Sequence, residues 1–197
     1  MAVRQSVKKE SAELRLALVC YGGVSLAVYM HGITRELQSL IRAARAFVKD
    51  SSHNPFRETS PDGTDAAYFD ALRDIEDAGR PLSVSIDIIG GTSAGGINGV
   101  ALAKALALGA GQDPLKKVWI EHGDLRDLLR APKLFGLLSQ GIMAALWQVI
   151  RSRGPSTPLR GELMSQLLLD ALQQMDEAKN VTTQIPQGGK LDLFVTA

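Results

Sequence analysis

Short apolar runs alternate along the chain with longer segments of helical periodicity. Residues 14–20, 83–89 and 190–197 are short and mostly apolar, a pattern typical of buried strands. Between the first two, apolar residues recur every three or four positions from Leu26 to Phe47, which predicts a long helix with one apolar face. Strands that alternate with helices predict an α/β fold with a largely parallel sheet.

Further helical patterns flank the second predicted strand. Gly79 and Pro81 predict where the first of these helices ends, and Gly109 predicts the end of the next. Residues 51–63 are polar and contain Pro and Gly, which predicts a loop. The helical patterns cover residues 64–81, 97–109, 113–130 and, after an initial loop, 154–178.

Composition narrows the class of protein. The length of 197 residues suits one domain, and a formal net charge of +1 gives no reason to expect a nucleic-acid partner. A single cysteine, Cys20, excludes an intramolecular disulfide and fits a reducing compartment. Residues 1–13 are polar and lack the apolar stretch of a secretory signal. We therefore expect a protein of the cytoplasm or of the inner membrane face.

One uncharged segment comes close to the length of a membrane span. Residues 134–150 are mostly apolar, and basic residues lie on both sides of them. A span needs about 20 predominantly apolar residues, and this run is shorter and contains Ser139, Gln140 and Gln148. It predicts a buried helix, with a lid or a peripheral contact to a membrane as the alternative.

A serine lies among glycines between the second predicted strand and the following helix. Gly91-Thr92-Ser93-Ala94-Gly95 fits G-x-S-x-G, in the strand–turn–helix context of a nucleophile elbow. Such a turn exposes the serine hydroxyl, and the N–H groups near Ala94 and at the start of the following helix can hold an oxyanion. The alternative is a plain glycine turn. Nucleotide binding is disfavoured because neither G-x-G-x-x-G nor a P-loop lysine is present.

A second glycine junction follows the first predicted strand, at Gly22 and Gly23. Alone it is as consistent with a bare turn as with a ligand site. The carboxyl ends of parallel strands meet at one edge of a sheet, where open α/β sheets bind ligands. One junction could then supply a nucleophile and the other could supply oxyanion donors.

Together the two junctions resemble the patatin-like phospholipases, a family of serine acylhydrolases. The resemblance rests on LALVCYGGVSLAVYMHGI (16–33) and DIIGGTSAGGING (87–99), and it looks closest to the bacterial patatin-related proteins. It implies that Ser93 is the nucleophile and that residues 14–197, after a polar lead-in of residues 1–13, form a three-layer α/β/α domain. Because the chain stops inside a predicted strand, we expect an N-terminal fragment with an incomplete sheet.

The oxyanion loop of the family is usually written G-G-G-x-R/K-G, and this chain departs from it. Gly22 and Gly23 match the first two glycines. Val24 stands at the third glycine, Leu26 at the basic residue and Ala27 at the last glycine. The backbone donors could remain, but the basic side chain is missing.

A serine needs a neighbouring base. The resemblance implies an Asp in an Asp-Gly-Gly or Asp-Gly-Ala motif, and no Asp-Gly follows Ser93 in this sequence. We therefore expect the base beyond residue 197 and expect the 197-residue chain alone to be inactive. A triad of Ser93, Asp113 and His122 is disfavoured because both partners fall in the helical stretch after the elbow. His31 fits a core position and His53 a polar loop.

No metal-ligand cluster and no cofactor are predicted from three scattered histidines and one cysteine. Asp87 reads as a structural carboxylate of the second strand, and Asn98 as a brace for the turn. Two functions stay open. The first is hydrolysis of a fatty-acyl ester of a lipid or phospholipid by an acyl-enzyme on Ser93. The second is a non-catalytic module for lipid binding or protein interaction.

Overall fold

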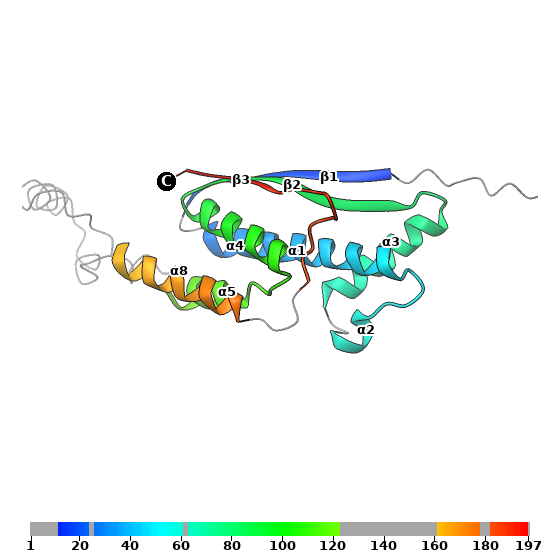
Figure 1. Ribbon diagram of the computed structural model, residues 1–197. Helices are drawn as coiled ribbons and strands as arrows, with labels where there is room; N and C mark the ends of the chain where they lie inside the picture. Colours follow the sequence, from blue (N-terminus) through cyan, green and yellow to red (C-terminus); the bar gives the residue numbers. More distant parts are fainter. Residues whose placement is uncertain (1–11, 24–25, 61–62, 123–160, 178–181, 197) are drawn as a thin grey trace, which may run out of the picture. The chain divides into compact units, whose positions relative to one another are not determined.

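The computed structural model describes residues 12–23, 26–60, 63–122, 161–177 and 182–196 (Figure 1). They form two compact units. The first comprises Met1–Gln112 together with Ala178–Ala197, and the second comprises Asp113–Glu177. The first unit contains the sheet and Ser93, so it holds the candidate site.

The elements of the first unit are β1 (Ala12–Cys20), α1 (Ala27–Lys49), α2 (Phe56–Thr59), α3 (Thr64–Asp77), β2 (Leu82–Thr92), α4 (Ala94–Leu108) and β3 (Asp192–Thr196). The three strands pair in parallel in the order β1-β2-β3. The predicted α/β class and the parallel sheet are confirmed. The second unit contains α5 (Asp113–His122) and α8 (Gly161–Asp176), which pack against each other.

The register of β1 against β2 shifts once. Leu16 pairs with Ile86 and Ala17 pairs with Ile88, so Asp87 is an extra residue on β2. The extra residue changes the alternation of the strand, so that Ile86 and Ile89 are buried whereas Ile88 is 42% exposed. Beyond it the register is regular, and Cys20 at the end of β1 pairs with Gly91. The bulge therefore sets which residues of the two strand ends lie side by side.

Helices α1, α3 and α4 lie on one face of the sheet, where the core forms (Figure 1). Burial of apolar surface at about 25 cal/mol per Å² is the main force that holds this layer to the sheet. The buried helix residues lie at the spacings of one helical face, and the buried apolar residues of β2 alternate except across the bulge, where Ile89 follows Ile86 by three residues. The largest are Ile41, Phe47, Phe69, Leu72, Val84, Ile86, Ile89, Leu102 and Leu106.

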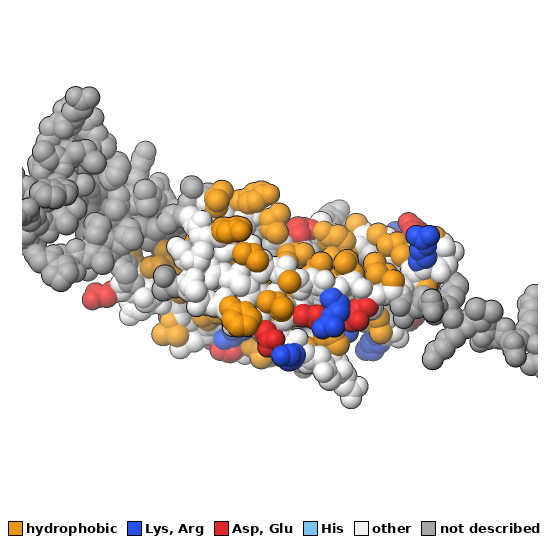
Figure 2. All heavy atoms as spheres, turned by 90° about the horizontal axis from the view of Figure 1, so that it is seen from above, with side chains coloured by type: hydrophobic (Ala, Val, Ile, Leu, Met, Phe, Trp, Pro, Cys, Tyr) orange, Lys and Arg blue, Asp and Glu red, His pale blue; other side chains and the backbone are white. Residues whose placement is uncertain are grey.

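The other face of the sheet carries exposed apolar side chains, which Figure 2 shows beside a charged group. Val19 is 70% exposed, Ile88 42% and Phe194 61%. Arg15 and Asp87, further from the carboxyl ends of the strands, form an ion pair. The described helices cover only the opposite face. A second layer of helices, expected from the three-layer resemblance, stays a prediction.

Two details of the predicted elements were wrong. Residues 56–59 of the expected loop form the short helix α2, whose N-cap residue is Pro55. The glycines after Ser93 were taken for a turn, but α4 begins at Ala94, three residues earlier than predicted. Its C-cap is Gly109 in the left-handed conformation, as its position in the sequence predicts.

Candidate active site

Ser93 lies between the last residue of β2 and the first residue of α4, with φ 53° and ψ −128°. It is the only non-glycine residue with positive φ in the described part of the chain. Such a conformation costs about 1–3 kcal/mol for a residue with a side chain. The Ser93 side chain is exposed, while Ala94 and Gly95 behind it are buried. The turn therefore presents the hydroxyl to solvent at the end of the sheet.

The glycines around the serine are required by close approach of backbone segments. A Cβ on Gly91 would lie 2.7 Å from the Cα of Gly96 and 2.7 Å from the carbonyl oxygen of Gly95. A Cβ on Gly95 would overlap the carbonyl oxygens of Cys20 and Tyr21. Real Cβ contacts this short do not occur, and backbone atoms have little room to move. The start of α4 can thus pack directly against the ends of β1 and β2.

The second glycine junction faces the serine. A Cβ on Gly22 would lie 2.8 Å from the Ser93 Cβ and 3.5 Å from its Oγ. Gly23 has φ 136°, a conformation that side chains disfavour, and its carbonyl accepts a hydrogen bond from the Leu26 amide at 3.1 Å. The structure therefore brings Gly22 and Ser93 together, as the parallel arrangement predicts. Val24, the third residue of this predicted loop, lies outside the described residues.

The backbone of Ser93 is fixed on two further sides. Its amide donates to the Thr196 carbonyl of β3 at 3.3 Å, and its carbonyl accepts from the Ile97 amide at 3.1 Å. The second bond is the first intrahelical bond of α4, so Ser93 is the N-cap residue. The contact with β3 was not foreseen, because nothing local in the sequence shows which strand lies beside the elbow.

Asn98 is fully buried one turn into α4 and links the two junctions. Its Nδ2 donates to the carbonyl of Ala94, four residues back, and to the carbonyl of Ala27 at the start of α1, both at 3.1 Å. The expected brace within the turn is present. The bond to Ala27 is an addition that sequence reasoning missed, since Ala27 is distant along the chain.

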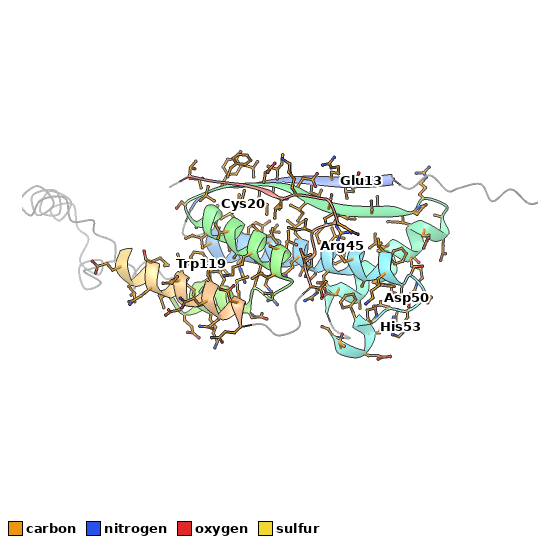
Figure 3. The ribbon with its side chains drawn as sticks, in the orientation of Figure 1. Glu13, Cys20, Arg45, Asp50, His53 and Trp119 are labelled. Carbon is orange, nitrogen blue, oxygen red and sulfur yellow. The ribbon has the colours of Figure 1, made fainter. Side chains whose placement is uncertain are left out.

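Cys20 ends β1 beside the elbow, and Figure 3 labels it there. Burial raises the pKa of its thiol, because a thiolate would lose hydration. A raised pKa keeps the sulfur in its neutral and weakly nucleophilic form at neutral pH. Ser93, in the turn, is the more exposed of the two residues.

Asp87, the carboxylate that precedes Ser93 most closely in sequence, interacts with residues of the strands. Asp87 accepts hydrogen bonds from the Arg15 guanidinium and from the Ser85 hydroxyl, the latter at 3.2 Å. The hydrogen bond that Arg15 donates to Asp87, together with the negative charge of Asp87, raises the pKa of Arg15. These contacts match the structural part predicted for Asp87.

The histidines occupy three different settings. His31 is buried on α1, as predicted, and His53 is exposed between α1 and α2. Asp113 and His122 are the first and last residues of α5. At 1.5 Å of rise per residue they lie about 14 Å apart along the helix axis, too far for Asp113 to hold the imidazole in place. The disfavoured triad is therefore not formed.

Of the helices in the described ranges, none is long and apolar enough to cross a membrane. The apolar segment 134–150 lies outside the described residues. In those same ranges, no group of three or more His, Cys, Asp or Glu side chains could hold a metal ion.

Part of the chain is similar in sequence to one curated protein. Over 127 residues, 61% of this chain, the sequence is 35% identical to the uncharacterized membrane protein Rv3479 of Mycobacterium tuberculosis. The match covers 11% of that protein, so the chain spans about a tenth of its length. No protein-family model and no solved structure matches the chain.

Proposed function

We propose that the protein is a serine acylhydrolase that cleaves fatty-acyl esters of lipids or phospholipids through an acyl-enzyme on Ser93. The observation that carries the proposal is the strained backbone of Ser93, in an exposed turn between a parallel strand and a helix. Strain of this kind is retained where the surrounding structure holds it, and it marks functional sites. The lipid ester as substrate comes from the resemblance of the two glycine motifs to patatin-like phospholipases.

In the proposed reaction, the Ser93 Oγ attacks the ester carbonyl, the alcohol leaves, and water releases the fatty acid from the acyl-enzyme. The developing oxyanion lies against N–H groups of the Ala94 turn and of Gly22 and Gly23. Two features support this assignment: the approach of Gly22 to Ser93, and the positive end of α4. A side chain at Gly22 would fill the space in front of the hydroxyl.

The base that activates Ser93 is assigned to no residue of the printed sequence. The resemblance implies an Asp of an Asp-Gly-Gly or Asp-Gly-Ala motif, and no Asp-Gly follows Ser93. The proposal places this Asp in residues beyond Ala197. The membrane protein that the chain is similar to leaves the function open, because it is uncharacterized.

The test is covalent labelling of the natural full-length protein by a fluorophosphonate probe, which forms a bond to an activated serine oxygen as fluoride leaves. We expect labelling in the wild-type protein and none in Ser93→Ala. Ser52→Ala is the matched control, since Ser52 is an exposed serine in the loop after α1 and should leave labelling unchanged.

Absence of labelling in a folded wild-type protein would overturn the proposal. It would favour the non-catalytic alternative, to which the departures at Val24, Leu26 and Ala27 also point. If the wild-type protein is labelled, hydrolysis of a short-chain ester that is lost in Ser93→Ala would show that the labelled serine turns over.

A further inference from the structure

Asn98 connects the nucleophile turn to the segment that follows the second glycine junction. Its side chain is 0% exposed, so each of its polar atoms must find a partner inside the protein. The amide nitrogen donates to Ala94, the residue after the serine, and to Ala27, the first residue of α1. One side chain thus joins two backbone segments that are far apart in sequence.

The two segments carry the two halves of the candidate site. Ala94 is next to Ser93, and Ala27 lies four residues after Gly23. Leu26, the residue before α1, donates its amide to the Gly23 carbonyl at 3.1 Å, which links the start of α1 to Gly23. A shift of Ala27 would therefore act on Gly23 through the Leu26 hydrogen bond, and so on Gly22, the residue that faces the serine.

Small residues alone do not fix this geometry. Gly22, Gly91 and Gly95 let the segments come close, because they lack side chains, but glycine adds conformational freedom rather than restraint. A bidentate buried amide supplies a directional restraint that apolar contacts do not. Asn98 is the described side chain that hydrogen-bonds both segments at once.

We infer that Asn98 is a positioning residue that holds the Gly22–Gly23 segment in register with Ser93, so that oxyanion donors and nucleophile face the same carbonyl. The inference rests on the proposed function. It assigns no contact between Asn98 and the substrate. Misplacement of about 1 Å between reacting groups can lower a rate about a hundredfold, so one lost restraint has a measurable effect.

The test uses Asn98→Ala and Asn98→Ser in the natural full-length protein. A serine in a helix donates its hydroxyl to the carbonyl four residues back, so it can keep the bond to Ala94. Its side chain is too short to reach Ala27 as well. We expect both variants to lose at least about tenfold in the maximal rate of fluorophosphonate labelling, with little change in the probe concentration at half-maximal rate.

Asn54→Ala is the matched control, since Asn54 is also a buried asparagine that donates to a backbone carbonyl, that of Ala66, at 3.1 Å. It follows His53, which lies toward the opposite end of the unit from Cys20 (Figure 3). This variant should lose stability but label at the wild-type rate. Hydrogen exchange of a peptide covering residues 21–32 should speed up in Asn98→Ala and not in Asn54→Ala.

The outcomes separate the two proposals. If wild-type protein is not labelled, the proposed function fails, and hydrogen exchange still decides whether Asn98 restrains residues 21–32. If the wild type is labelled and folded Asn98→Ala is labelled equally fast, the positioning inference is overturned while the proposed function stands. Recovery of the wild-type rate in Asn98→Ser would overturn it too, because the bond within α4 would then suffice.

Discussion

The two ends of the first unit are held together by different forces. At the end that carries Ser93, backbone segments touch directly across Gly22, Gly91 and Gly95, and one buried amide links them. At the end that carries α2 and α3, large rings and charges make the contacts. The ring centroids of Phe69 and Phe47 lie 5.1 Å apart in an edge-to-face arrangement.

Charges at the second end are arranged around α3. Arg57 donates to Asp70 at 2.6 Å, and Arg42 forms an ion pair with Asp65, which is almost fully buried. The two ends should therefore respond to different changes. Side-chain volume and backbone conformation decide the stability of the serine end, whereas ring packing and protonation decide that of the α2–α3 end.

The largest expected effect is that of a single methyl group at the serine end. Gly95→Ala should lower the free energy of unfolding by about 3 kcal/mol, because its Cβ would overlap the carbonyl oxygens of Cys20 and Tyr21. Urea denaturation measures the change. Gly32→Ala is the control: its Cβ meets nothing within 4 Å on α1, so it should raise stability by about 0.5 kcal/mol. Equal changes in the free energy of unfolding for the two substitutions would show that close backbone contact does not limit side-chain volume at the serine end.

A smaller effect should follow from the backbone strain at Ser93. Ser93→Gly should be more stable than Ser93→Ala by about 1 kcal/mol, since glycine adopts φ 53° without the steric cost that alanine has. Both variants remove the hydroxyl, so the difference isolates the backbone. Thermal unfolding of the two proteins side by side checks it. A more stable alanine variant would show that the turn relaxes to an unstrained conformation.

The smallest expected effect on stability is that of protonating Asp70 at the α2–α3 end. The hydrogen bond from Asn54, together with Arg57 and Arg73, lowers the pKa of Asp70. Its ionised form is thus favoured by folding. The stabilisation is present above the unfolded-state pKa of about 3.9 and is lost as pH falls through the lower folded-state value.

Asp70→Asn should therefore be less stable than the wild type at pH 7, and the difference should shrink below about pH 4. Urea denaturation at pH 7, 5 and 3 measures this, and fluorophosphonate labelling at pH 7 should not change. A stability difference that is constant over this pH range would show that the Asp70 charge has no part in it.

Local patterns were enough to predict the strands, the long helix and the strand–turn–helix arrangement at Ser93. The apolar run that ends at Cys20 and the run that ends before Gly90 predicted β1 and β2, although β2 extends through the glycines to Thr92. Glycine has low helix propensity, so Gly95 and Gly96 led to a predicted start of the helix after the start of α4. Tertiary contact overrides propensity there, since only small residues fit against β1.

The relation between the two halves of the site could be anticipated only in outline. Parallel strands predicted that the junctions would meet at one edge. Which residue of the first faces Ser93 depends on the bulge at Asp87, which no local pattern shows. The bond from Asn98 to Ala27 likewise depends on the packing of α4 against α1. The sequence pattern predicts the type of each element, but it does not predict the register between strands and helices that are far apart in the chain.

The order of the parallel strands has a consequence for how the chain folds. β1 pairs with a strand about seventy residues away, and β2 pairs with a strand about a hundred residues further on. Contacts of such sequence separation form slowly, because the entropy of closing long loops must be lost before any pairing is gained. Ser93 bonds to Thr196 of β3, so its turn should take its final shape late, after the helices have formed.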